Sequence, residues 1–157
     1  MKIRKLEEKD IPVVLQMIEE ARENMKKMNL DQWQDGSPNE NTLRKYLKNG
    51  NGYISEEQNA FGAIVKQDVD YKLHLSGDYV VLHTFVVDQK LRGTGLSNDF
   101  FYEIIKIAKS EGNTIFALDT HRDNKYMLRF IRNHGFMELG SVMINGTKPR
   151  IAFYINL

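Results

Sequence analysis

The chain has 157 residues, of which 41% are hydrophobic and 27% charged, a balance typical of a globular domain rather than of a disordered or membrane-embedded chain. Its 22 Lys and Arg residues against 21 Asp and Glu residues lack the basic excess of a broad nucleic-acid-binding surface. The absence of cysteine excludes disulfides, thiolate metal sites and a cysteine nucleophile. We therefore expect one domain, residues 1–157, without a nucleic-acid partner or a metal.

The first half of the chain predicts a strand, two helices and two further strands. A short opening strand holds Ile3 and Leu6, and Asp10 can cap a helix that has Pro12 in its first turn. Gly36 and Pro38 mark a loop over residues 31–39. Helical spacing of apolar residues defines the two helices, through Ile11, Val14, Leu15, Ile18, Ala21, Met25 and Met28 and then through Leu43, Tyr46 and Leu47. Strands are predicted near residues 52–55 and 60–66.

The second half adds the signals of a mixed sheet. The run 78–87 is apolar at most positions, as in a strand buried on both faces. A helix over about 97–111, a strand over 114–119 and a helix over 124–134 follow. Asn145-Gly146 marks a hairpin turn. The order β-α-α-β-β-β-α-β-α-β-β predicts an α/β domain with a mixed sheet of about six to seven strands and about four helices.

A glycine-rich segment joins the strand that ends at Val87 to the next helix. From Arg92 to Ser97 it reads R-G-T-G-L-S. Glycines let a backbone turn sharply and approach a ligand, and the amides and dipole at a helix start favour a pyrophosphate. The segment lacks the lysine of a nucleoside-triphosphate loop, and Asn98 stands where a dinucleotide loop has its third glycine. The remaining pattern is R-x-x-G-x-G/A.

On this loop, the chain resembles the GNAT acetyltransferase superfamily, and the resemblance covers nearly its whole length. Residues 124–136, N-K-Y-M-L-R-F-I-R-N-H-G-F, are similar to the family's N-x-x-A-x-x-x-Y-x-x-x-G-F helix and turn. The two signatures occur in order with a strand between them. The resemblance implies an acetyl-CoA-dependent N-acetyltransferase, in which a primary amine of a small molecule or a protein attacks the thioester directly in a ternary complex.

The resemblance also implies a division of roles among the site residues. Backbone groups of the 85–87 stretch would pair with the pantetheine arm as an added strand does. Amides of the loop would hold the pyrophosphate, and the Asn124 side chain would bond the pantetheine arm near the sulfur. The implied cofactor-binding residues are Phe85, Val86, Val87, Arg92, Gly93, Thr94, Gly95, Leu96, Ser97 and Asn124.

Three positions depart from the family pattern. Ser97 stands where Gly or Ala is usual, and Met127 replaces a small residue. Ile131 occupies the position at which many members carry a tyrosine that protonates the leaving thiolate, so that role cannot be transferred to it. A thiol has an ordinary pKa of about 8.5, so the leaving group can take its proton from water.

Histidines and a tryptophan are the remaining candidates. His83 lies on the strand beside the expected thioester, where its side chain is either the general base or a space-filling group. Histidine ordinarily titrates at about pH 6.5, which suits a base. Trp33 either lines the acceptor pocket or plugs the core. His121 either touches the acceptor or belongs to a loop that caps the next helix. The position of His134 at a helix C-terminus, where a cation is favourable, indicates a structural role.

Two other functions remain open on the sequence. Because Ile131 replaces the tyrosine, the chain could be an acyl-CoA-binding sensor or interaction module with little turnover. A third, weaker alternative is that it binds a different nucleotide. No run of about 18 apolar residues and no signal-peptide core occurs, which predicts a cytoplasmic protein without a membrane partner. If the chain self-associates, a homodimer is the expected assembly.

Overall fold

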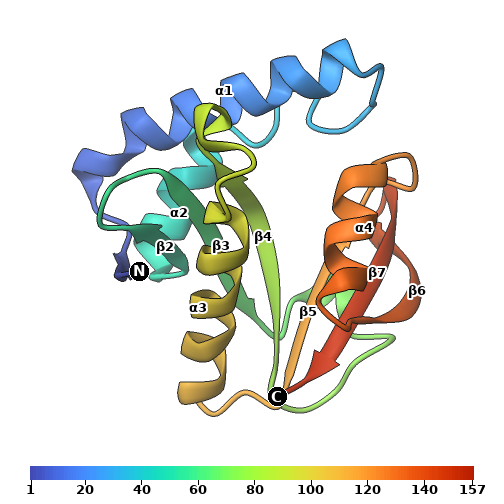
Figure 1. Ribbon diagram of the computed structural model, residues 1–157. Helices are drawn as coiled ribbons and strands as arrows, with labels where there is room; N and C mark the ends of the chain where they lie inside the picture. Colours follow the sequence, from blue (N-terminus) through green and yellow to red (C-terminus); the bar gives the residue numbers. More distant parts are fainter. The chain divides into compact units, whose positions relative to one another are not determined.

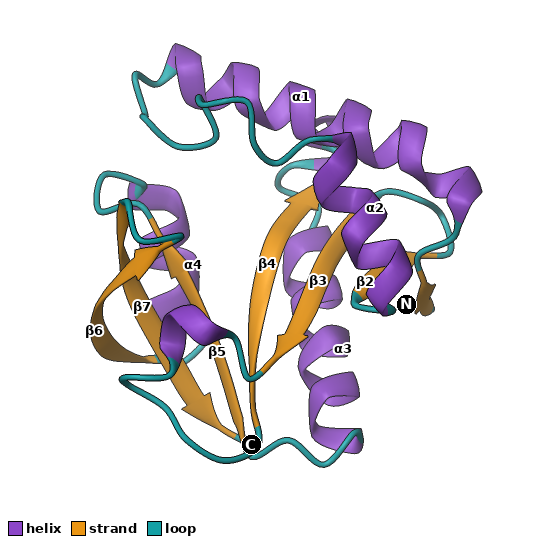
Figure 2. Cartoon of the chain, turned by 180° about the vertical axis from the view of Figure 1, so that it is seen from behind, coloured by secondary structure: helices purple, strands orange, loops and turns teal.

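The computed structural model describes residues 1–157, and its elements follow the predicted order (Figures 1 and 2). The predicted α/β class, with a mixed sheet of seven strands and four α-helices, is confirmed. The strand order is β1-β2-β3-β4-β5-β7-β6. The helices are α1 (Ile11–Lys27), α2 (Glu40–Asn49), α3 (Leu96–Ser110) and α4 (Lys125–Asn133). The strands are β1 (Ile3–Lys5), β2 (Gly52–Ser55), β3 (Ala60–Lys66), β4 (Tyr79–Val87), β5 (Ile115–Thr120), β6 (Met137–Ile144) and β7 (Lys148–Asn156).

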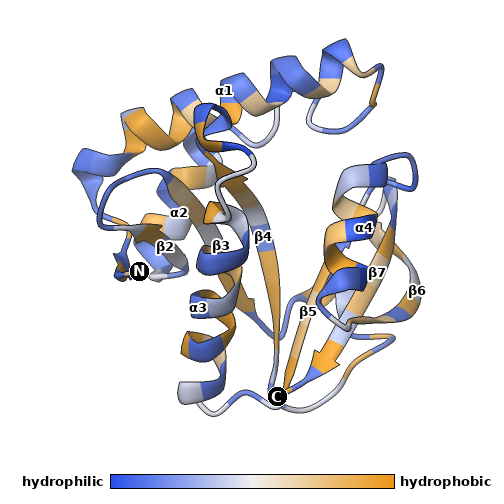
Figure 3. Cartoon of the chain, viewed as in Figure 1, coloured by the Kyte–Doolittle hydropathy of each residue, from blue (hydrophilic) through white to orange (hydrophobic).

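The chain forms two compact units, to both of which β4 contributes. The first unit comprises Met1–Ile64 and His83–Ile107, and the second comprises Val65–Leu82 and Ala108–Leu157. No helix in either unit combines the length and the apolar character that crossing a membrane requires. The helices α1, α3 and α4 carry both hydrophobic and hydrophilic residues (Figure 3), as helices with one buried face do.

The core of the first unit lies between α1, α2 and the strands β2 and β3. The predicted helical spacing of α1 is confirmed as far as Ala21, but Met28 is 45% exposed because it follows the last turn of the helix. The core residues are Leu6, Ile11, Val14, Met17, Ile18, Ala21, Leu43, Ile54, Phe61, Ala63 and Val86.

Asp10 stands at the N-cap position of α1, as predicted, but its side chain does not cap that helix. Its backbone is already helical there, because a short 3-10 turn, η1 (Glu8–Asp10), leads directly into α1. The carboxylate instead accepts hydrogen bonds from Arg4 and Gln58 and from the Glu7 amide. Asp10 therefore ties the start of α1 to β1 and to the β2–β3 turn.

The second unit is built on β5 and the C-terminal hairpin. β5 pairs in parallel with β4 from Tyr79 to Leu82 and antiparallel with β7. The predicted turn is confirmed: Asn145 and Gly146, both with positive φ, lie between β6 and β7. β6 and β7 pair along their length, with a register shift at Glu138 to Gly140.

A segment that the sequence left unassigned, residues 67–77, contributes a buried tyrosine to this unit. It contains a 3-10 turn, η2 (Val69–Tyr71), and Tyr71 is fully buried. The Tyr71 hydroxyl donates to Asp119 Oδ2 near the end of β5, at 2.5 Å. Burial, and then the Asp119 charge, raise the pKa of Tyr71 well above its ordinary value, so the hydroxyl keeps the proton that it donates.

Candidate active site

The second half of β4 contains a break in its extended backbone. Pairing with β5 runs from Tyr79 to Leu82, whereas β4 continues to Val87. Thr84 has a φ of +53° in the middle of this strand, a conformation that β-branched residues rarely adopt. Such local strain is concentrated at functional sites, where it re-aims the residues that follow. Here those residues are the 85–87 stretch.

The segment that joins β4 to α3 is a tight loop closed by its own hydrogen bonds. The Asp88 side chain accepts from the Lys90 amide at 2.9 Å, and a 3-10 turn, η3 (Gln89–Leu91), follows. The Thr94 hydroxyl donates to the Leu91 carbonyl at 2.5 Å. Lys90 and Arg92 are exposed, so the loop carries two positive charges at its surface.

Gly93 and Gly95 fix the path of this loop. Their φ values are +80° and +89°, which only glycine adopts without a steric penalty. A Cβ at either position would meet no heavy atom within 4 Å, so the requirement for glycine is conformational and not one of packing. The space in front of both glycines is open to a ligand.

The start of α3 presents backbone amides beside these glycines. Leu96 is the first helical residue and is buried, which anchors the helix start to the unit. The Asp99 amide donates to the Gly95 carbonyl, which closes the first turn. The amides before Asp99 have no intrahelical acceptor, and they lie at the positive end of the helix dipole. This arrangement fits an anion such as a pyrophosphate.

Asn124 is the N-cap of α4. It is 9% exposed, and its side-chain oxygen accepts from the Met127 amide at 3.1 Å. On the same helix Ile131 is fully buried. The second predicted signature therefore forms the expected helix, and at the position of the usual tyrosine it has an apolar side chain without access to solvent.

The sequence matches the acetyltransferase (GNAT) family over residues 15–136, more than half of the chain. It belongs to this family. The resemblance drawn from the glycine loop and from the Asn124 signature is thereby confirmed.

Solved structures agree with this assignment. A GNAT family acetyltransferase from Streptococcus agalactiae 2603 is 26% identical, with a TM-score of 0.86 over 99% of this chain and 95% of that chain. Ribosomal-protein-alanine N-acetyltransferase from Brucella melitensis is 19% identical, with a TM-score of 0.73 over 100% of both chains. The structure of yncA from Salmonella typhimurium, with its cofactor acetyl-CoA, is 14% identical, with a TM-score of 0.70 over 100% of this chain and 94% of that chain. The Brucella and Salmonella structures show the shared fold. None of the curated proteins matches the chain.

The candidate residues of this GNAT family member are divided between the two units. The first unit carries His83, the 85–87 stretch, the loop 92–97 and Trp33, and the second carries His121 and Asn124. His83 is half-buried and directly precedes Thr84. The assignment of His83 as the base stays a prediction.

Two of the other histidines, His121 and His134, have local structural partners. His121 Nδ1 accepts a hydrogen bond from the Asp123 amide at 3.0 Å, so a neutral His121 ring carries its proton on Nε2. This hydrogen bond ties His121 to the loop before α4, and its contact with the acceptor stays a prediction. His134 lies against the Phe130 ring, at a centroid distance of 4.3 Å, and its Nδ1 is 2.7 Å from the Phe130 carbonyl oxygen.

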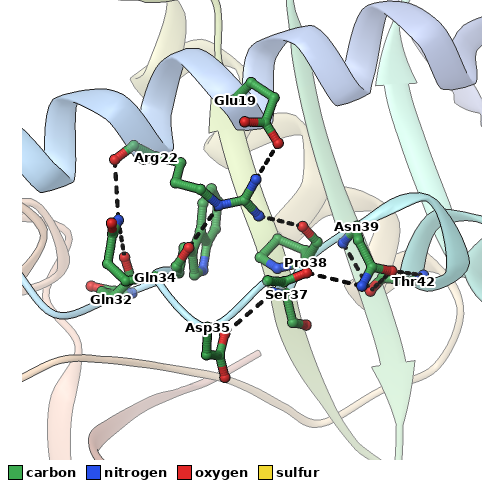
Figure 4. Close-up of polar contacts among 11 residues, drawn as sticks. Glu19, Arg22, Gln32, Gln34, Asp35, Ser37, Pro38, Asn39 and Thr42 are labelled. Carbon is green, nitrogen blue, oxygen red and sulfur yellow. Dashed lines mark hydrogen bonds and ion pairs between the residues drawn. The ribbon is translucent and has the colours of Figure 1, made fainter.

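The loop that carries Trp33 is tied to Arg22 of α1, a residue that no sequence pattern singles out (Figure 4). Arg22 donates through Nε to the Trp33 carbonyl at 2.7 Å and through Nη2 to the Pro38 carbonyl at 2.5 Å. Its own carbonyl accepts from the Gln34 side chain at 3.1 Å. Trp33 itself is half-buried against the core of the first unit, with a φ of +62°. Arg22 therefore fixes the Trp33 backbone in a strained conformation.

We expect Arg22→Ala to loosen this loop and to expose Trp33. Loss of two charge-assisted hydrogen bonds to carbonyls should lower the free energy of unfolding by about 1–3 kcal/mol. Because Trp33 is the sole tryptophan, acrylamide quenching of its fluorescence reports the loop directly. Arg44→Ala is the control, since Arg44 bridges the exposed Glu8 and Glu40 and should leave both readouts nearly unchanged. Equal quenching in Arg22→Ala and wild type would contradict the tethering role.

Proposed function

We propose that this GNAT family member transfers an acetyl group from acetyl-CoA to a primary amine of a small molecule or a protein. Family membership supports the acetyl transfer, and the glycine loop between β4 and α3 is the observation that carries the cofactor assignment. The loop combines two left-handed glycines, helix-start amides and the exposed Lys90 and Arg92, which suit a pyrophosphate. The bound yncA cofactor shows that this fold accommodates acetyl-CoA in that protein.

In the proposed reaction, the acceptor amine attacks the thioester carbonyl carbon directly. A base removes the amine proton, the C–N bond forms, the C–S bond breaks, and the CoA thiolate takes a proton from water. His83 is the proposed base because it lies on β4 just before the 85–87 stretch, along which the pantetheine arm would pair.

Ligand-dependent thermal unfolding tests the cofactor assignment. At about 100 times its Kd, acetyl-CoA should stabilise the fold by roughly 2.7 kcal/mol. That corresponds to an increase of about 5–10 °C in Tm for a chain of this size. NADH and ATP are the controls, since neither should match this increase. No increase with acetyl-CoA, or an equal increase with ATP, would contradict the assignment, and a positive result leads to a screen of amines for CoA release.

We expect Gly95→Ala to weaken acetyl-CoA binding about 5- to 30-fold, because an alanine at this φ costs about 1–2 kcal/mol and shifts the loop. Gly112→Ala is a matched control: Gly112 has a φ of +87°, follows the opposite end of α3 and also faces open space. Both variants should lose similar stability, but only Gly95→Ala should raise the Kd measured by calorimetry. Equal Kd values for the two variants would remove the loop from the cofactor site.

A second candidate function is an acyl-CoA sensor, and the buried Ile131 favours it. An apolar side chain that is fully buried on α4 cannot protonate a leaving group. A sensor would bind acetyl-CoA in the unfolding assay but release no CoA with any amine in the screen. Turnover with even one amine decides in favour of the transferase.

A further inference from the structure

The strained Thr84 has a specific partner on α2. Of the six non-glycine residues with positive φ, Thr84 is the one inside a strand; the others are Asn29, Trp33, Gln58, Gln67 and Asn145. The Tyr46 hydroxyl lies 2.9 Å from the Thr84 hydroxyl, within hydrogen-bond distance. A β-branched residue leaves this conformation readily unless its surroundings hold it. The Tyr46 contact supplies such a restraint.

Tyr46 is itself firmly placed. Its ring packs against Phe61 of β3 at a centroid distance of 6.2 Å, and it lies against the core of the first unit. The helix that carries Tyr46 begins at a reciprocal cap. Asn39 Oδ1 accepts from the Thr42 backbone amide, and the Asn39 backbone amide donates to the Thr42 hydroxyl. The hydroxyl of Tyr46 therefore comes from a rigid element.

The residues just after Thr84 are held from another side. The Phe85 ring lies 6.0 Å from Phe100 and 5.7 Å from Phe101, both fully buried on α3. Val86 is buried in the core. Two contacts therefore hold the 85–87 backbone. The Tyr46 and Thr84 hydroxyls meet at the left-handed turn itself, and the Phe85 ring packs against α3 just after it.

We propose that the Tyr46 and Thr84 hydroxyls form a lock that holds the left-handed turn in β4 and so positions the 85–87 backbone to pair with pantetheine. This inference rests on the proposed function, because it assigns Tyr46 and Thr84 as positioning residues for the cofactor. The lock acts through β4 and touches no reacting atom.

The variants Tyr46→Phe and Thr84→Val each break the hydroxyl pair, and each leaves a β-branched side chain at position 84, where φ is strained. Loss of a hydrogen bond of ordinary strength predicts an acetyl-CoA Kd that rises about 2- to 13-fold in each, measured by calorimetry at 25 °C. Thr84→Gly also lacks the hydroxyl, but glycine adopts this φ without strain. It should therefore bind acetyl-CoA more tightly than Thr84→Val does, and adding Tyr46→Phe to it should cause no further loss.

Tyr102→Phe is the control for the tyrosine change, since Tyr102 is 65% exposed on α3 and should leave the Kd unchanged. Urea unfolding without ligand separates positioning from folding. A merely structural contact would lower stability in Tyr46→Phe and leave the Kd of the folded protein unchanged, which would overturn the lock. Thr84→Gly binding as weakly as Thr84→Val would also overturn it. Failure of the wild type to bind acetyl-CoA would overturn the proposed function together with the lock.

Discussion

Asp10→Ala is expected to lower the free energy of unfolding by about 3 kcal/mol. The change breaks an ion pair whose carboxylate is fully buried, and it leaves the hydrogen-bond donors around that carboxylate without their acceptor. The Asp10 side chain is fully buried, and it takes two hydrogen bonds from Arg4 at 2.7 and 2.9 Å. Gln58 and the Glu7 amide donate to it at 2.7 and 2.8 Å. Urea unfolding at pH 7 measures the loss. Glu8→Ala, at an exposed carboxylate two residues away, is the control and should change little.

The same carboxylate gives the protein a defined pH dependence. The hydrogen bond from Arg4 lowers the pKa of Asp10 from 3.8 to about 2, against the opposing effect of burial. Because the folded pKa is depressed, the contribution is fully present above pH 3.8 and is lost as the pH falls toward 2. The shift corresponds to roughly 2 kcal/mol. The difference in free energy of unfolding between wild type and Asp10→Asn should therefore decrease by roughly 2 kcal/mol between pH 5 and pH 2. A difference that is constant over this range would contradict the ionised pair.

The elements of this fold were predictable where the signal is local. Apolar spacing gave α1 to within a residue, and glycine positions gave the loop before α3 and the ends of the last two helices. Asn145-Gly146 placed the final hairpin. Each of these signals depends on neighbouring residues, whose conformational preferences are the same in any fold.

The contacts that shape the site were not predictable, because they join residues far apart in the sequence. Threonine is an ordinary residue type in a strand, so no local signal marks Thr84. Its positive φ depends on Tyr46, 38 positions earlier. The Tyr71 hydroxyl donates to Asp119, 48 positions later. The residues next to Tyr71 have no local pattern that predicts this contact. Asp10 illustrates a different failure: its residue type suits a helix cap, but the ion pair with Arg4 took precedence.

His83 is the base that we propose for the acceptor side of the reaction. We expect His83→Ala to lower kcat/KM about 10²- to 10⁴-fold, the range for loss of a general base, with any amine that supports CoA release. The Kd of acetyl-CoA should not change, because in the proposed reaction the side chain acts on the acceptor proton and the loop holds the cofactor. A merely space-filling imidazole predicts the opposite pattern, with lower stability and near-normal turnover of the folded enzyme.

The pH profile separates the two roles of His83. A base must be neutral to accept a proton, so the kcat of the wild type, which reports ionisations in the bound complex, should fall on the acidic side, and His83→Ala should lose that limb. His83→Asn keeps a polar side chain of similar size, so it guards against a packing defect in the alanine variant. His74→Ala, at an exposed position in the 67–77 segment, should leave the profile intact. If the acidic limb persists in both His83 variants, another group removes the amine proton, and His83 fills space on β4.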